Sequence, residues 1–156
     1  MRQLFFILFF LLSCKSKSTH IDFLEKAIKA EMNIKTDSIK YLIVVPSGGC
    51  SGCISEGINF IKDNIEVLNK HRSELRIVFT AVTSLKTLKN NVGESVLNSS
   101  ISYIDHNNSY FTPCNESIYP VVLYLKNKTV NSFHYKSPQS PSSFDDLLVK
   151  LQNEKN

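Results

Sequence analysis

The sequence predicts an α/β domain with a mixed central β-sheet that is flanked by helices on both faces. Two patterns carry this prediction: short apolar runs alternate with stretches of helical periodicity, and a hairpin pattern precedes the last helix. Alternating strands and helices predict parallel strands joined by right-handed crossovers, whereas a closing hairpin adds antiparallel strands. With 156 residues, 42% of them hydrophobic, the chain suits one compact domain.

The first predicted elements are a helix and a buried strand. Thr19 and Asp22 have the spacing of a capping box, and apolar residues then recur at helical spacing through about Ile34. Residues 41–45 form a short apolar run that is rich in β-branched side chains. Such a run is typical of a strand buried on both faces.

The longest predicted helix follows the second cysteine of the segment CSGC. Its apolar side chains recur with a helical period and define one face of about four turns. Residues 75–82 are expected to form a second buried strand, and residues 84–92 a short helix that ends near Gly93. The apolar residues of the long helix are Ile54, Ile58, Ile61, Ile65 and Leu68.

The carboxyl-terminal part of the chain predicts a third strand, a hairpin and a last helix. Residues 101–105 are the candidate third strand, and an irregular stretch follows it with some helix near its end. Residues 121–125 and 129–135 have the pattern of a hairpin around a Lys-Asn-Lys turn. The last helix has cap spacing at Ser142 and Asp145 and an apolar face of Phe144, Leu147, Leu148 and Leu151.

Residues 1–13 are predicted to be a lipoprotein signal peptide. Arg2 precedes the apolar run of residues 4–12, which is far too short to span a bilayer as a helix. The segment Leu11–Cys14 resembles the lipobox of bacterial lipoproteins, in which cleavage before the cysteine leaves that residue to carry a lipid. The alternative is an ordinary signal peptide followed by a chance cysteine.

The lipobox resemblance implies where the mature protein works. Residues 14–20 would form a tether and residues 21–156 a single domain, anchored to a membrane by a lipid on Cys14. The expected location is the periplasmic side of the bacterial cell envelope. The net charge of +4 is dispersed and no basic stripe with interleaved aromatic residues occurs, so nucleic acid is not an expected partner.

The cysteine pattern predicts redox chemistry. Cys50 and Cys53 join the end of a predicted strand to the start of a helix, where free N–H groups and the helix dipole favour a thiolate. Cys50 would attack a disulfide, and Cys53 would then attack the mixed disulfide and release the product. A loop this small stabilises a fold little, which disfavours a mere staple. A zinc site is also disfavoured because the other candidate ligands are scattered singly: His71, His106, Cys114 and His134.

At this point the chain resembles the thioredoxin-like superfamily. Three features carry the resemblance: the strand-CSGC-helix unit, Tyr119-Pro120 directly before the predicted hairpin, and Glu56 three residues after Cys53. The last of these is similar to the C-x-x-C-x-x-E of membrane-anchored thiol-disulfide oxidoreductases of the bacterial envelope. The resemblance covers roughly residues 40–152 and implies a thioredoxin-like fold.

The resemblance also implies roles for single residues. Cys50 would be the nucleophile, Cys53 the resolving thiol and Glu56 their proton partner. Pro120 would be a cis-proline that leaves the backbone of Tyr119 free to bind an extended substrate. No cofactor or metal would be needed, and disulfide-containing or thiol proteins of the envelope, or small thiols, would be the partners. The alternative for Glu56 is an acidic residue that is favoured there only by the helix dipole. The alternative for Pro120 is a trans proline at the first residue of a strand.

Departures from the family pattern leave other functions open. Gly49 and Gly52 occupy the places where the family has Trp and Pro, the chain has no Trp, and Val44 stands where thioredoxin has a buried Asp. One alternative is a non-catalytic thioredoxin-fold binding lipoprotein with a structural CSGC disulfide. Another is a copper-handling envelope protein that uses thiols with His106 or His134.

Cys114 is the remaining thiol of the predicted mature chain, in the irregular stretch before Pro120. It is expected to be a buried or partly buried free thiol without a catalytic role. The alternative is a third redox thiol that bridges to Cys50 or Cys53 in the oxidised protein.

Overall fold

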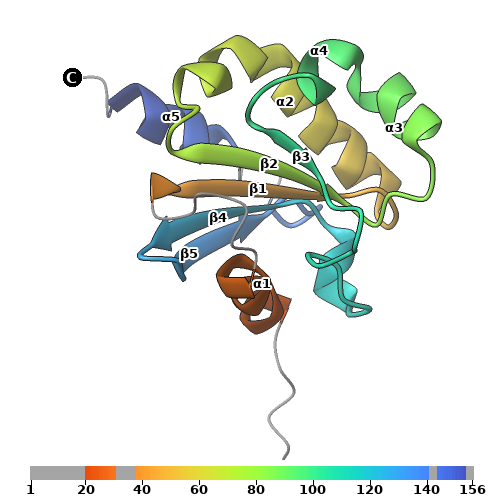
Figure 1. The fold of residues 1–156 in the computed structure, drawn as a ribbon, viewed down its shortest axis with the longest axis horizontal. Coiled ribbons are helices and arrows are strands. Elements are labelled where there is room, and N and C mark those ends of the chain that lie inside the picture. Colours follow the sequence, from red (N-terminus) through yellow and green to blue (C-terminus); the bar gives the residue numbers. More distant parts are fainter. Residues whose placement is uncertain (1–19, 31–37, 141–143, 154–156) are drawn as a thin grey trace, which may run out of the picture.

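The computed structural model describes residues 20–30, 38–140 and 144–153, which form a layered α/β fold (Figure 1). Its helices and strands follow the predicted alternation closely. In chain order they are α1 (His20–Ala30), β1 (Tyr41–Pro46), α2 (Ser51–Lys70), β2 (Leu75–Thr80), α3 (Leu85–Val92), α4 (Glu94–Leu97), β3 (Ser102–Ile104), the 3-10 helix η2 (Asn115–Ile118), β4 (Val121–Lys126), β5 (Thr129–Tyr135) and α5 (Asp145–Asn153).

The five strands form one mixed sheet in the order β3-β2-β1-β4-β5. β1 runs parallel to β2, and β2 runs parallel to β3. β4 runs antiparallel to both β1 and β5. The predicted mixed sheet is therefore confirmed, and β1 is its central strand with all of its residues buried.

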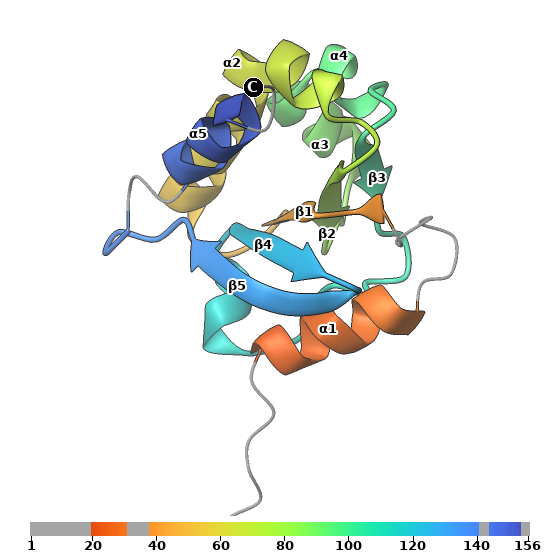
Figure 2. The same cartoon turned by 90° about the vertical axis from the view of Figure 1, so that its left-hand side faces the viewer.

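Helices cover both faces of this sheet, as predicted. α2, α3, α4 and α5 lie on one face and α1 on the other (Figures 1 and 2). Successive residues of β1 alternate between the two faces: Ile43 and Val45 pack in the core under α2, whereas Leu42 and Val44 pack in the core under α1. Burial on both faces explains why this strand has a continuous apolar sequence rather than an alternating one.

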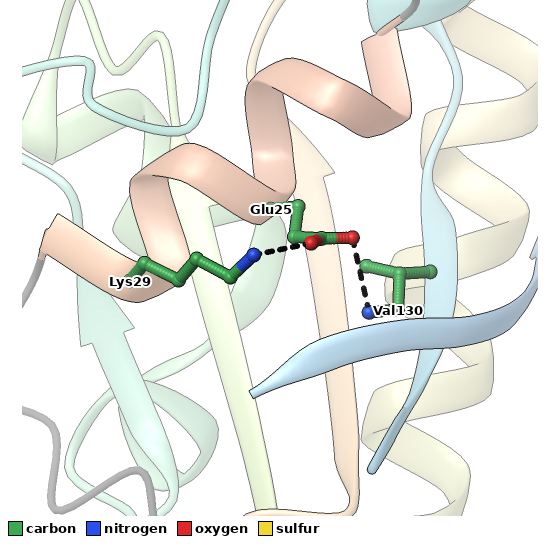
Figure 3. A network of polar contacts seen from close by, with 3 residues as sticks. All are labelled: Glu25, Lys29 and Val130. Carbon is green, nitrogen blue, oxygen red and sulfur yellow. Dashed lines mark hydrogen bonds and ion pairs between the residues drawn. The ribbon is translucent and has the colours of Figure 1, made fainter. Parts of the chain in front are cut away.

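α1 is attached to the edge strand β5 by a carboxylate. Figure 3 shows Glu25 between Lys29 on the same helix and the backbone of Val130. The Val130 amide donates to Glu25 Oε2 at 3.3 Å, and Lys29 forms an ion pair with Oε1. The hydrogen bond and charge of Lys29 hold the pKa of Glu25 below its ordinary value. This contact places α1 under the hairpin of β4 and β5.

Several boundaries differ from the predicted ones. α1 begins at His20, the last residue of the predicted tether, while Thr19 and Ile34 lie outside the described residues. β2 ends at Thr80, two residues early, because Ala81 has a φ of 55° and leaves the extended region. The short helix α4 was not predicted, and it begins after Gly93, whose φ is 89°.

The predicted hairpin is confirmed and its turn has a local cause. Asn127 and Lys128 connect β4 to β5 with φ values of 52° and 63°. Two residues with positive φ are what a type I′ turn requires, and the twist of that turn matches the twist of paired strands. Asn127 favours this turn, because asparagine adopts a positive φ more readily than most residues do.

The predicted signal peptide and Cys14 lie outside the described residues, as does Ser142, the predicted cap of the last helix. Within residues 20–30, 38–140 and 144–153, no helix has both the length and the apolar character needed to cross a membrane.

Candidate functional site

Cys50 and Cys53 form a disulfide at the amino end of α2. The central strand β1 ends at Pro46, a short exposed loop follows, and Cys50 is the residue that caps α2 in an extended conformation. Their Cα atoms are 5.3 Å apart. Cys53 is only 7% exposed, whereas Cys50 is half-buried. An incoming thiol or thiolate therefore meets Cys50 before Cys53.

The start of α2 provides positive electrostatic potential at Cys50. The Ile54 amide donates the first helical bond to the Cys50 carbonyl at 2.9 Å, and the earlier amides of the turn have no partner within the helix. The first turn contains no acidic residue. Because the free N–H groups carry partial positive charge, a thiolate on Cys50 would be stabilised there.

The segment that precedes β4 lies against the loop before Cys50. The Cys50 amide donates to the Ile118 carbonyl at 3.2 Å. Gly49 has a φ of 132°, and a Cβ added to it would stand 2.6 Å from the Cβ of Ile118. The chain can approach this closely only because residue 49 has no side chain. The structure therefore explains why residue 49 is a glycine.

Pro120 lies beside the first turns of α2 but is not a cis-proline. The described residues contain no cis peptide bond, so the expected cis Tyr119–Pro120 bond is wrong. Tyr119 has φ −107° and ψ 140°, the extended conformation that a following proline favours, and it leads from η2 directly into β4. Pro120 is buried against Gly57, where an added Cβ would be 3.1 Å from Pro120 Cγ.

Tyr119 lies next to this contact and is half-buried. Its amide donates to the carbonyl of Glu116 at 3.2 Å, which closes the short helix η2. The carbonyl of Pro120 accepts from the amide of Lys136 at 2.7 Å. Whether the Tyr119 backbone binds an extended substrate remains a prediction.

Glu56 lies on the exposed side of α2 and is paired with a residue that the sequence did not suggest. Its Oε2 atom is 3.2 Å from Lys136 Nζ, and the side chains of Glu56 and Lys136 are 61% and 14% exposed. Lys136 follows directly after β5. No local pattern could have identified it, because only the pairing of β4 with β5 brings it to α2.

Cys114 is half-buried and forms no disulfide. It precedes η2, where its carbonyl accepts from the Ser117 hydroxyl at 2.7 Å. Burial, with smaller contributions from Glu116 and Cys114, raises the pKa of Tyr135. Since Cys50 and Cys53 are joined to each other, the bridge to Cys114 that a third redox thiol would make is not the one formed in the structure.

A buried carboxylate holds the chain that leads from β3 towards the site. Asp105 is 1% exposed and accepts from the Thr80 hydroxyl at 2.7 Å and from the amides of Ser109 and Tyr110 at 2.9 and 2.8 Å. Its own amide donates to the Phe79 carbonyl at 2.9 Å. These bonds fix the start of the irregular stretch that ends at Ile118 and Pro120.

A small cavity of about 50 Å³ lies next to Ile54, the residue after Cys53. It is bounded by the end of β1, the first turns of α2 and the start of α3. Ser47 and Ile54, which flank the two cysteines in sequence, are part of its wall. The full lining is Val45, Pro46, Ser47, Ile54, Ile58, Phe79, Thr83, Ser84, Thr87, Leu88 and Asn91, none of which is charged.

The candidate metal ligands do not come together in the described part of the chain. No group of three or more His, Cys, Asp or Glu side chains there could hold a metal ion. His134 packs edge-on against Tyr124, and His106 is exposed after β3.

Four of the predicted site residues thus meet around the first turns of α2: Cys50, Cys53, Glu56 and Pro120. Comparisons of the chain with protein-family models, with curated proteins and with solved structures gave no match. We therefore assign the site from its residues and their geometry.

Proposed function

We propose that this protein is a thiol-disulfide oxidoreductase with a thioredoxin-like fold, anchored in the bacterial cell envelope by a lipid on Cys14. The observation that carries the proposal is the Cys50–Cys53 disulfide at the amino end of α2, with Cys50 the more exposed of the two residues. The alternative of a structural staple explains this position less well, because a loop so short contributes little to stability.

The arrangement of elements supports a thioredoxin-like fold. α2 follows the central strand β1 directly, and the β4–β5 hairpin pairs with the other edge of β1. The CSGC segment thereby lies at the carboxyl end of the central strand, beside the residue that opens β4. In open α/β sheets this end is where ligands and substrates usually bind.

The proposed reaction is a reversible exchange of two electrons. In the reduced protein the Cys50 thiolate attacks one sulfur of a substrate disulfide, forming a mixed disulfide and releasing the other sulfur as a thiolate that takes up a proton. Cys53 then loses its proton and attacks Cys50 Sγ, which releases the second substrate thiol and leaves the Cys50–Cys53 disulfide. The substrate is reduced and the protein oxidised, and a dithiol donor must restore the starting state.

Glu56 is the proposed proton partner for these steps. It stands three residues after Cys53, which places both side chains on neighbouring positions of one helix face. The carboxylate is mostly exposed and can exchange protons with solvent. No bound cofactor is required in this scheme because the sulfur atoms themselves carry the electrons.

The proposed partners are envelope proteins with an accessible disulfide or dithiol, or small thiols. A small cavity of about 50 Å³ with an uncharged lining lies next to Ile54, the residue after Cys53, and supports an uncharged group of the substrate near the site. The lipid anchor would keep the domain near membrane-bound partners.

A trapping experiment tests this proposal. A Cys53→Ser variant should accumulate a mixed disulfide between Cys50 and a disulfide-bonded test protein, because the resolving thiol is missing. A Cys50→Ser variant should accumulate none, and a Cys114→Ala variant should behave as the unaltered protein. Mass spectrometry of alkylated peptides reads each cysteine separately. If no variant forms the adduct and the unaltered protein does not accelerate reduction of the test protein by dithiothreitol, the pair is structural and the proposal fails.

A further inference from the structure

Two contacts hold Lys136 beside the first turns of α2. Its backbone amide donates to the Pro120 carbonyl at 2.7 Å, and Pro120 in turn packs against Gly57 of α2. Its Nζ atom is 3.2 Å from Glu56 Oε2 on the same helix. The ammonium group therefore lies beside Glu56, which is three residues after Cys53 on α2.

The two charges of this ion pair differ in their exposure to solvent. The Lys136 side chain is 14% exposed, whereas that of Glu56 is 61% exposed. Solvent screens a covered charge less than an open one, so the field of the ammonium group reaches further through the protein. Glu56, three residues from Cys53 on the helix, contributes a field of the opposite sign.

From this geometry we infer that Lys136 and Glu56 tune the redox equilibrium of the Cys50–Cys53 pair in opposite directions. The disulfide is uncharged, whereas the reduced form has a thiolate that a cation stabilises and an anion destabilises. Lys136 therefore favours the reduced form and Glu56 favours the disulfide. The two charges together set the equilibrium between the reduced form and the disulfide. This inference rests on the proposed function, since the balance decides which partners the pair can reduce or oxidise.

Other charged groups on the neighbouring elements stay constant in the test. They include Glu116 in η2, Asp145 and Asp146 at the start of α5, and Lys62 and Asp63 on α2, all of them exposed. The partial charge of the α2 amino end also stays constant. A shift of the redox equilibrium after substitution of Lys136 or Glu56 therefore measures the effect of that residue.

The experiment equilibrates the full-length protein, in detergent near neutral pH, with mixtures of reduced and oxidised dithiothreitol, and reads the oxidised fraction by alkylation and mass spectrometry. For Glu56→Gln, the equilibrium constant for reduction of the disulfide should rise about threefold, as expected for the loss of one partly exposed charge interaction. For Lys136→Met it should fall by about threefold or more, because this charge is the less screened. The double variant should lie between the two.

The two single variants are expected to shift the redox equilibrium in opposite directions, which distinguishes an electrostatic effect from a structural one. Both single variants break the same ion pair, so a role in holding the loop would move them in the same direction. Shifts of equal sign, or no shift in either variant, would overturn the inference. The Lys40–Glu74 ion pair, 2.8 Å long and placed before β1 and β2, is the matched control, and Glu74→Gln should leave the equilibrium unchanged.

The two proposals fail in different ways. Opposite shifts without catalysis on a disulfide-bonded protein would leave the charge effect standing and overturn the proposed function. Catalysis with equal or absent shifts would leave the function standing and overturn the role of Lys136.

Discussion

Gly49 lies against the backbone of Ile118, and the Cα of Ile118 would be 2.7 Å from any Cβ added to Gly49. The contact joins the loop before Cys50 to the segment before β4, and the Cys50 amide bonds to Ile118 at the same place. Position 49 also has a φ of 132°, which residues with a side chain rarely adopt. Both effects require glycine directly before the first cysteine.

We expect Gly49→Ala to reduce the free energy of unfolding by about 1–3 kcal/mol, because the chain must either strain residue 49 or move Ile118 away. Urea unfolding measures this change. Gly48→Ala is the matched control, since nothing lies within 4 Å of a Cβ added there. Equal stability of the two variants would show that the approach of Ile118 is not needed by the fold.

Gly57 and Gly52 both lie inside α2, so alanine at either position gains helix propensity, worth up to about 1 kcal/mol. A Cβ at Gly52 meets nothing within 4 Å, but a Cβ at Gly57 stands 3.1 Å from Pro120 Cγ. We therefore expect Gly52→Ala to stabilise the protein and Gly57→Ala to lose that gain. Thermal unfolding of both variants measures the difference, and equal stabilisation would contradict a tight contact between Gly57 and Pro120.

Asp105→Ala is expected to cost about 2–3 kcal/mol of unfolding free energy, because it removes the acceptor of three hydrogen bonds at a site that is 1% exposed. Chemical denaturation measures the loss. The exposed Asp63 on α2 provides the control, and Asp63→Ala should have little effect. A loss below about 0.5 kcal/mol for Asp105→Ala would contradict its role in holding the chain after β3.

His20 predicts a dependence of stability on pH. Its ring is 4% exposed and its Nδ1 atom is 2.9 Å from the Tyr135 hydroxyl. Burial lowers its pKa from the ordinary value of 6.5, against a smaller opposing effect of Glu116. In the unfolded chain the imidazole binds a proton near its ordinary pKa, whereas in the folded chain it does so only at lower pH.

The unfolded state therefore binds more protons as the pH falls below the ordinary pKa of His20, and the free energy of unfolding should decrease over that range. Above it, the contribution of His20 should be constant. Urea unfolding between about pH 5 and pH 8 tests this range, which brackets the titration of an unperturbed histidine. His20→Gln should flatten the pH dependence, whereas His106→Gln, at an exposed position, should retain it.

Local sequence patterns were sufficient for most of the helices and strands. A continuous apolar run predicted β1, a helical period predicted α2, and the Lys-Asn-Lys segment predicted the hairpin. Where β2 and α4 differ from the predicted elements, a single residue with a positive φ explains each difference. Ala81 adopts a positive φ and ends β2 early, and Gly93 separates α4 from α3.

The expectation for Pro120 failed because it came from resemblance rather than from this chain. In the described residues the Tyr119–Pro120 bond is trans, and Tyr119 has the extended backbone that is usual before a proline. The sequence marked Gly49 only as a departure from the family pattern. In the structure Gly49 lies directly against Ile118, a contact that depends on the path of a distant segment.

The sequence by itself determined the Cys50–Cys53 pair and its place at the start of a helix, since residues three apart in a helical turn are neighbours whatever surrounds them. Only the tertiary structure decided what surrounds that pair. Ile118 reaches the loop before α2, and Pro120 and Lys136 reach its first turns, because β4 pairs with β1, and β5 with β4, in one register. Such pairings are set by the packing of the whole core, and no single stretch of sequence contains them.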